Sequence, residues 1–127
     1  MLKRLLVVDD DDLSRDILAD LFEEKYEIIH CKDGRQAMSA IAIQFGQIEA
    51  VLLDLVMPNM DGFEFLQKLA EKGWNKKFPV IVISGNDEAE NRQRCNKMGV
   101  KYFISKPYSG RKARAAIEEA ISGFPGV

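Results

Sequence analysis

The stretch LLVVDDDD, residues Leu5–Asp12, places four apolar residues directly before four carboxylates. A short apolar run that contains β-branched residues is typical of a buried strand. Four adjacent carboxylates repel one another, so they need solvent or a counter-charge. The run is therefore either a solvated turn with a helix cap, or part of a cation site.

Four similar apolar runs follow, separated by segments with helical periodicity. The runs are Ile28–Ile29, Val51–Leu53, Val80–Ile83 and Tyr102–Ile104. The first helical segment, Leu13–Glu24, has an expected buried stripe of Leu13, Ile17, Leu18, Leu21 and Phe22, and the fourth, Asp87–Met98, is poor in apolar residues. Apolar strands that alternate with helices predict a parallel sheet covered on both faces. We therefore predict a doubly wound α/β fold with five strands and five helices.

The composition is that of one soluble domain. The 127 residues are 46% hydrophobic and 30% charged, and the net charge of −2 offers no basis for direct nucleic-acid binding. No stretch has the length of a membrane span, and the N-terminus lacks a signal-peptide pattern. Cys31 and Cys95 lack metal-ligand spacing and are expected to be buried or half-buried, reduced thiols. We expect a cytoplasmic protein with its domain at residues 1–123 and a tail, or the start of a linker, at 124–127.

Polar residues follow four of the predicted strands. They are Asp9 and Asp10, Asp54, Ser84, and Lys106. Ligands of such sheets bind at the carboxyl ends of the strands, so these side chains should converge. Three clustered acids favour a divalent cation, and few carboxylates with no Cys/His cluster favour Mg²⁺ over Ca²⁺ or Zn²⁺.

The added hydroxyl and ammonium indicate phosphoryl chemistry. Lys106, Ser84 and Mg²⁺ could each stabilise one oxygen of a transferring phosphoryl group. An aspartate can itself be the nucleophile and form an aspartyl phosphate. Asp54 is the candidate, because it ends the central strand.

Four motifs give the chain a resemblance to the receiver domain of two-component response regulators. The motifs are LLVVDD, DLVMPNMDG (Asp54–Gly62), VIVISG and YFISKP. Ser84 lies 30 residues (84 − 54) and Lys106 52 residues (106 − 54) after Asp54, the separations of that family. The resemblance covers nearly the whole chain, includes the single-domain chemotaxis-type receivers, and implies a flavodoxin-like sheet of order 2-1-3-4-5.

The resemblance also implies roles for individual residues. Asp10, Asp54 and the backbone carbonyl of Val56 would bind Mg²⁺, and Asp9 would act through a water. Asp54 would accept a phosphoryl group from a histidine kinase or a histidine phosphotransfer protein. Ser84 would be the switch hydroxyl, Phe103 the switch aromatic and Lys106 the partner of the phosphate, with a cis bond between Lys106 and Pro107.

The output of such a domain would be a downstream effector protein or domain. It would bind through the fourth helix, fifth strand and fifth helix, a surface that includes Arg92, Lys97, Tyr102, Phe103, Tyr108 and Arg111. Val56 and Asn86 occupy the positions that tune phosphate lifetime in the family. An apolar Val56 would not orient an attacking water, which predicts a lifetime that is not especially short.

The sequence also allows other interpretations of single residues and of the function. Asp12 is expected to cap the first helix, with Asp11 merely exposed, and Asp61-Gly62 to open the third helix. A phosphatase of the haloacid-dehalogenase type would also form an aspartyl phosphate, but it needs an acid at the position of Val56. The third possibility is a receiver-like binding module that is never phosphorylated, and the intact acid, hydroxyl and lysine set counts against it.

Overall fold

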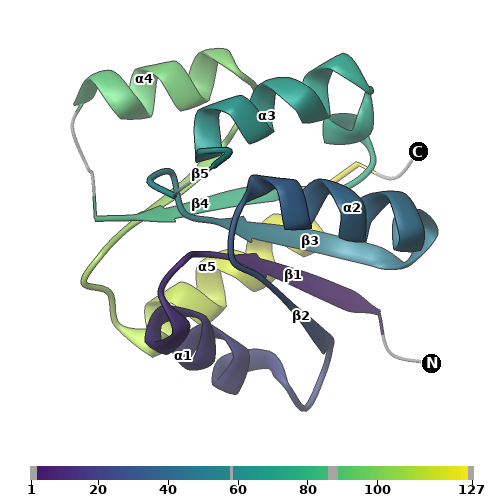
Figure 1. Ribbon diagram of the computed structural model, residues 1–127. Coiled ribbons are helices and arrows are strands. Elements are labelled where there is room, and N and C mark those ends of the chain that lie inside the picture. The colour runs from purple at the N-terminus through teal and green to yellow at the C-terminus, as the bar shows by residue number, and fades with distance from the viewer. Residues whose placement is uncertain (1–2, 58, 86–88, 126–127) are drawn as a thin grey trace.

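The protein is a parallel five-stranded sheet between two layers of helices, as Figure 1 shows for the computed structural model. The structure describes residues 3–57, 59–85 and 89–125. In these residues the strands are β1 (Arg4–Val8), β2 (Glu27–Cys31), β3 (Ile48–Leu53), β4 (Val80–Ser84) and β5 (Tyr102–Ser105). The helices are α1 (Asp12–Phe22), α2 (Gly34–Gln44), α3 (Gly62–Glu71), α4 (Ala89–Lys97) and α5 (Gly110–Ser122).

The strand order is β2-β1-β3-β4-β5, with every neighbouring pair parallel, as predicted. β1 pairs with β2 on one side and β3 on the other, so Val8 lies beside both Cys31 and Leu53. β2 and β3 are longer than their predicted apolar runs, because flanking residues such as Glu27 continue the pairing with β1. The reversal of strand order on either side of β1 brings the ends of β1 and β3 together.

Each face of the sheet carries its own hydrophobic core. Leu6 and Val8 face α2, α3 and α4, whereas Leu5 and Val7 face α1 and α5 (Figure 1). Successive residues of a strand point to opposite faces, so burial of both faces requires the continuous apolar strands seen in the sequence. In the parts of the chain described here, no helix has the length and apolar character to cross a bilayer.

The buried stripe of α1 differs from the predicted one. Leu13 and Ile17 are 66% and 46% exposed, whereas Leu18 and Phe22 are buried as expected. The first buried position of the helix is instead Arg15. The burial of residues 15, 18, 19 and 22 still follows a helical period, but in a phase that turns Leu13 and Ile17 toward solvent.

The prediction that Asp12 caps α1 is wrong, because Asp11 is the cap. Asp11 has extended backbone and accepts hydrogen bonds from the N–H and hydroxyl of Ser14, at 3.0 and 2.7 Å. These hydrogen bonds lower the pKa of Asp11. Asp12 is the first helical residue and pairs with Arg15. The prediction for the third helix is confirmed, since Asp61 accepts from the N–H of Glu64 at 2.9 Å.

Helix α4 is the most weakly anchored helix of the described chain. Cys95 is its one buried residue, which confirms the thin apolar stripe. The predicted start at Asp87 lies outside the described residues. Both Cys31 and Cys95 are buried free thiols, also as predicted.

Gly62 provides a test of how closely α3 packs against the loop after β3. A Cβ there would lie 2.6 Å from Leu55 Cα and 2.8 Å from the Asp54 carbonyl oxygen. Gly62→Ala should therefore lower the free energy of unfolding by about 1–3 kcal/mol, measured by urea denaturation. For Gly46→Ala, where no described atom lies within 4 Å of the new Cβ, we expect a change within about 0.5 kcal/mol. Equal effects of the two substitutions would contradict the packing argument.

Candidate functional site

The candidate site lies at the carboxyl edge of the sheet, where the backbone of each contributing residue is held by a neighbouring strand. The N–H of Asp9 donates to the carbonyl of Cys31 at 3.0 Å, and that of Asp54 to Val8 at 2.9 Å. The N–H of Lys106 donates to the carbonyl of Ser84 at 3.0 Å. The parallel ladder thus extends one residue beyond the strands and fixes the origin of each functional side chain.

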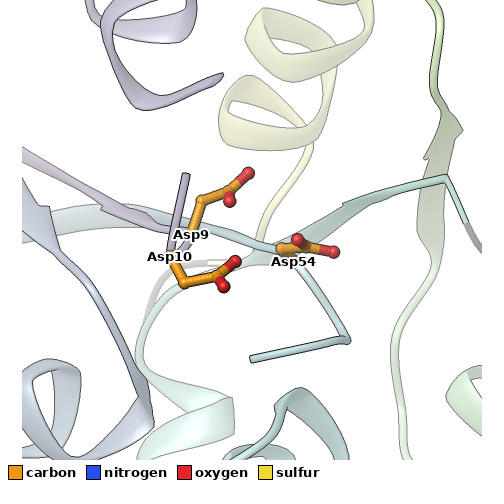
Figure 2. A group of neighbouring side chains, drawn as sticks. All are labelled: Asp9, Asp10 and Asp54. Atoms are coloured by element: carbon orange, nitrogen blue, oxygen red, sulfur yellow. The ribbon is translucent and has the colours of Figure 1, made fainter. Parts of the chain in front are cut away.

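Three carboxylates meet at this edge, as Figure 2 shows for Asp9, Asp10 and Asp54. One carboxylate oxygen from each lies within 4.8 Å of the others. Asp9 is buried, Asp54 is half-buried and Asp10 is exposed. The convergence predicted from the strand ends is therefore present in the structure.

Lys106 supplies the positive charge nearest to this cluster. Its Nζ lies 2.8 Å from Asp9 Oδ2 and 3.8 Å from Asp54 Oδ2. Asp9 Oδ1 also accepts a hydrogen bond from the N–H of Asp11 at 2.9 Å. Both oxygens of Asp9 are thus engaged by the protein.

The electrostatics of Asp54 and Lys106 reflect burial and mutual attraction. Burial raises the pKa of Asp54, with a further rise from the charge of Asp9. The charge of Lys106 and hydrogen bonds from Val56 and Ser84 oppose this rise without cancelling it. Burial alone would lower the pKa of Lys106, but the Asp9 hydrogen bond and the two carboxylate charges raise it above its usual value.

Ser84 is placed to act beside Asp54. It is the last residue of β4, its side chain is buried, and its hydroxyl is near enough to the Asp54 carboxylate to help lower the pKa of Asp54. Val56 is 61% exposed, and its N–H donates to Asp54 Oδ1 at 3.4 Å. Asn86, the other position tied to phosphate lifetime, lies outside the described residues.

Phe103 lies on β5, half-buried, under the guanidinium of Arg92. The Arg92 guanidinium carbon is 4.5 Å from the ring centroid, and its Nη2 donates to Ser105 Oγ at 2.8 Å. A guanidinium at this distance attracts the ring face. Arg92 therefore connects α4 to two residues of β5. The Lys106-Pro107 bond is cis, as the resemblance implied.

Arg15 is a site residue that the sequence reasoning missed. Its guanidinium is buried, donates to the backbone carbonyl of Asp9 and pairs with Asp12. The spacing of three residues between Asp12 and Arg15 indicates that these two side chains could pair on a helix. The hydrogen bond from Arg15 to the Asp9 carbonyl could not be predicted, because it depends on how α1 packs. Arg15 thus holds the peptide between Asp9 and Asp10 in place.

The loop after Asp54 is tied to the start of α2 by contacts that the sequence did not predict. Asn59 has a φ of 64° and donates through Nδ2 to Asp33 Oδ2 at 3.0 Å. The N–H of Gly34 donates to the carbonyl of Met60 at 3.1 Å. An asparagine in this loop was a weak indication of a residue with positive φ, because its short side chain tolerates left-handed backbone.

Residues 5–118 match the response regulator receiver domain family. The sensor histidine kinase RcsC of Escherichia coli K12 is 38% identical over 104 residues, which are 81% of this chain and 10% of RcsC. The transcriptional regulatory protein SrrA of Staphylococcus aureus NCTC 8325 is 34% identical over 113 residues, 88% of this chain and 45% of SrrA. The chain thus spans about a tenth of the length of the first of these curated relatives.

Solved structures show the same fold. A CheY-like response regulator receiver domain protein of Methanospirillum hungatei JF-1 superposes with a TM-score of 0.85 and 29% identity, covering 96% of this chain and 95% of that one. The Borrelia burgdorferi CheX-CheY complex with BeF₃ and Mg²⁺ gives a TM-score of 0.84 and 30% identity, covering 92% and 87%.

Asp54→Asn tests the electrostatic cost of the cluster. The folded pKa of Asp54 is raised above 3.8, so protonation favours the fold. The ionised form of Asp54 destabilises the folded state. This destabilisation is absent below the pKa of Asp54 in the unfolded chain, and it reaches its full size above the pKa of Asp54 in the folded protein. In EDTA, the variant should therefore be more stable than wild type at about pH 7, with a gain that shrinks toward about pH 3.5.

Urea denaturation at the two pH values measures this gain. Asp16→Asn, which removes an exposed carboxylate of α1, controls for the loss of one negative charge. A gain that is the same at both pH values, or that Asp16→Asn reproduces, would contradict the assignment of the cost to Asp54.

Proposed function

The chain belongs to the response regulator receiver domain family of two-component signalling, and from this premise we propose that it is an Mg²⁺-dependent switch phosphorylated on Asp54. The observation that carries the proposal is the convergence of Asp9, Asp10 and Asp54, with the Lys106 ammonium beside Asp9 and Asp54. Such a cluster has oxygen ligands for a cation and a fixed positive charge for a phosphate.

The donor set fits Mg²⁺. Its ligand atoms are carboxylate oxygens from two strand ends, and Mg²⁺ favours one or two carboxylates together with water and phosphate oxygens. Because both Asp9 oxygens are engaged by Lys106 and Asp11, we assign direct contact to Asp10, Asp54 and the Val56 carbonyl. Asp9 would act through a water. When bound, the ion would neutralise charge that develops on the phosphoryl oxygens.

Asp54 would act as the nucleophile. One carboxylate oxygen attacks the phosphorus of a phosphohistidine, the phosphorus–nitrogen bond breaks, and the histidine leaves. Lys106, already 3.8 Å from Asp54 Oδ2, would receive one oxygen of the transferred group, and the Ser84 hydroxyl a second. Since phosphorylation adds negative charge and strong acceptors, both donors gain contacts in this state that they lack in the other.

The phosphoryl donor would be a histidine kinase or a histidine phosphotransfer protein, and the recipient of the signal an effector protein or domain. We assign the effector surface to α4, β5 and α5. Its support is the linkage of Arg92 to Phe103 and Ser105, next to Ser84 and Lys106. Movement of Ser84 toward a phosphate would let Phe103 change its position, and α4 is the helix with the least apolar burial. We propose that this receiver comprises residues 1–123.

Turnover of external phosphoesters is a weaker alternative. A haloacid-dehalogenase-type phosphatase needs a general acid two residues after the nucleophile, and Val56 at that position has no proton to give. A receiver would accumulate phosphorylated Asp54, whereas a phosphatase would release phosphate with each turnover. This difference separates the two activities.

Phosphorylation from a small donor tests the proposal. Incubation with acetyl phosphate and Mg²⁺ should add one phosphoryl group, seen as a mass increase of the intact protein. Asp54→Asn should abolish this adduct, and so should EDTA. Asp61→Asn is the matched control, because asparagine caps a helix as well as aspartate does. An adduct that persists in Asp54→Asn would contradict the assignment.

Val56 allows a test of phosphate lifetime. Its apolar, exposed side chain cannot orient an attacking water, whereas the amide of Val56→Asn can donate to one or accept from one. The variant should lose phosphate faster than wild type by roughly three- to tenfold. This increase is small compared with the rate increase that a positioned general base provides. The measurement is the decay of the phosphorylated species after removal of acetyl phosphate. Identical decay rates would remove Val56 from the account.

A further inference from the structure

A pocket lies at the opposite end of the strands from Asp54. It has a volume of about 400 Å³ and is lined by Val80 and Tyr102, the first residues of β4 and β5. The switch hydroxyl Ser84 is the last residue of β4. Val80 and Ser84 lie at opposite ends of the five-residue strand, four residue steps or about 13 Å apart. The pocket is therefore separate from the acidic cluster.

Buried apolar side chains form part of the pocket wall. Leu66, Phe78, Val100 and Ala120 line it, and all four residues are buried. They come from α3, from the segments before β4 and β5, and from α5. A pocket of this size with such walls can enclose most of a small organic molecule.

The charged part of the lining has one sign. Lys76 and Lys101 line the pocket and are exposed, and its described lining contains no Asp or Glu. This is notable because the whole chain has more acidic than basic residues, 20 against 18. The lysines lie in the segments before β4 and β5, so both loops bring positive charge to the pocket.

We propose that this pocket binds a small apolar molecule that carries one anionic group, such as an aromatic carboxylate. The apolar body would pack against the apolar side chains of Leu66, Phe78 and Val100. The carboxylate would stay at the rim, where the ammonium groups of Lys76 and Lys101 can pair with it. A neutral ligand would gain only the apolar contacts, so charge is the basis of discrimination.

Naphthoate and its neutral analogue naphthylmethanol are suitable probes. Each is titrated into the isotope-labelled protein in EDTA, without phosphorylation, and backbone amide signals are followed by NMR. Naphthoate should shift the signals of Leu66, Val100 and Tyr102 in a saturable manner, with a dissociation constant on the order of 1 mM or lower. Naphthylmethanol should bind several-fold more weakly at the same residues.

Lysine variants test the charge. Lys76→Gln and Lys101→Gln should each weaken naphthoate binding by roughly two- to fivefold, as expected for exposed ion pairs, and leave naphthylmethanol unchanged. Lys77→Gln is the matched control, since Lys77 is exposed and adjacent in sequence but is not part of the lining. Its affinity for naphthoate should equal that of wild type.

Four outcomes would overturn the proposal. They are equal affinity for both probes, no saturable shift, shifts centred on Asp54 instead of the pocket, and shifts of the pocket signals with protein concentration alone. The last would indicate a second copy of the chain as the occupant. Because the titration uses neither Mg²⁺ nor phosphate, its result does not depend on the proposed phosphorylation of Asp54.

Discussion

The ion pair between Lys106 and Asp9 is the interaction on which the acidic edge of this fold depends. Three carboxylates with oxygens within 4.8 Å of one another would repel strongly, and the Lys106 ammonium, 2.8 Å from Asp9, is the close positive charge that opposes this. Arg15 supports the same edge through the Asp9 carbonyl. The compensation is incomplete, since burial still keeps the pKa of Asp54 raised. An edge with this residual excess of negative charge is suited to a cation, which is the physical basis of the proposed function.

The same residues connect the acidic edge to a surface that could carry a signal. Ser84 ends β4 and Lys106 directly follows β5, and their backbones are hydrogen-bonded to each other. Phe103 and Ser105 lie on β5 between them and Arg92 of α4. A helix that buries only Cys95 along its length can shift at low cost when such contacts change. A signal from the acidic edge to β5 and α4 therefore needs no long-range pathway, because these contacts are short.

The sequence alone could predict the fold and the convergence of Asp9, Asp10, Asp54 and Lys106, because parallel strands deliver their last residues to one edge. The sequence could not predict details that change when an element shifts by one residue. The cap was placed on Asp12 instead of Asp11, since either acid suits a helix start. Leu13 and Ile17 were expected to be buried, but the phase in which α1 packs turns them to solvent. The lysine-rimmed pocket was also hidden, because α3, α5 and the segments before β4 and β5 form it together and none of them has a motif.

We propose that Asp54 accepts the phosphoryl group within a site completed by Mg²⁺, Lys106 and Ser84. A crystal structure of the protein with beryllofluoride and Mg²⁺ tests it most directly. We predict beryllium bonded to an Asp54 carboxylate oxygen, with fluorides that accept from Lys106 Nζ and Ser84 Oγ, and Mg²⁺ on Asp10, Asp54 and the Val56 carbonyl. Beryllium on Asp9 or Asp10, or none at this edge under saturating conditions, would contradict the account.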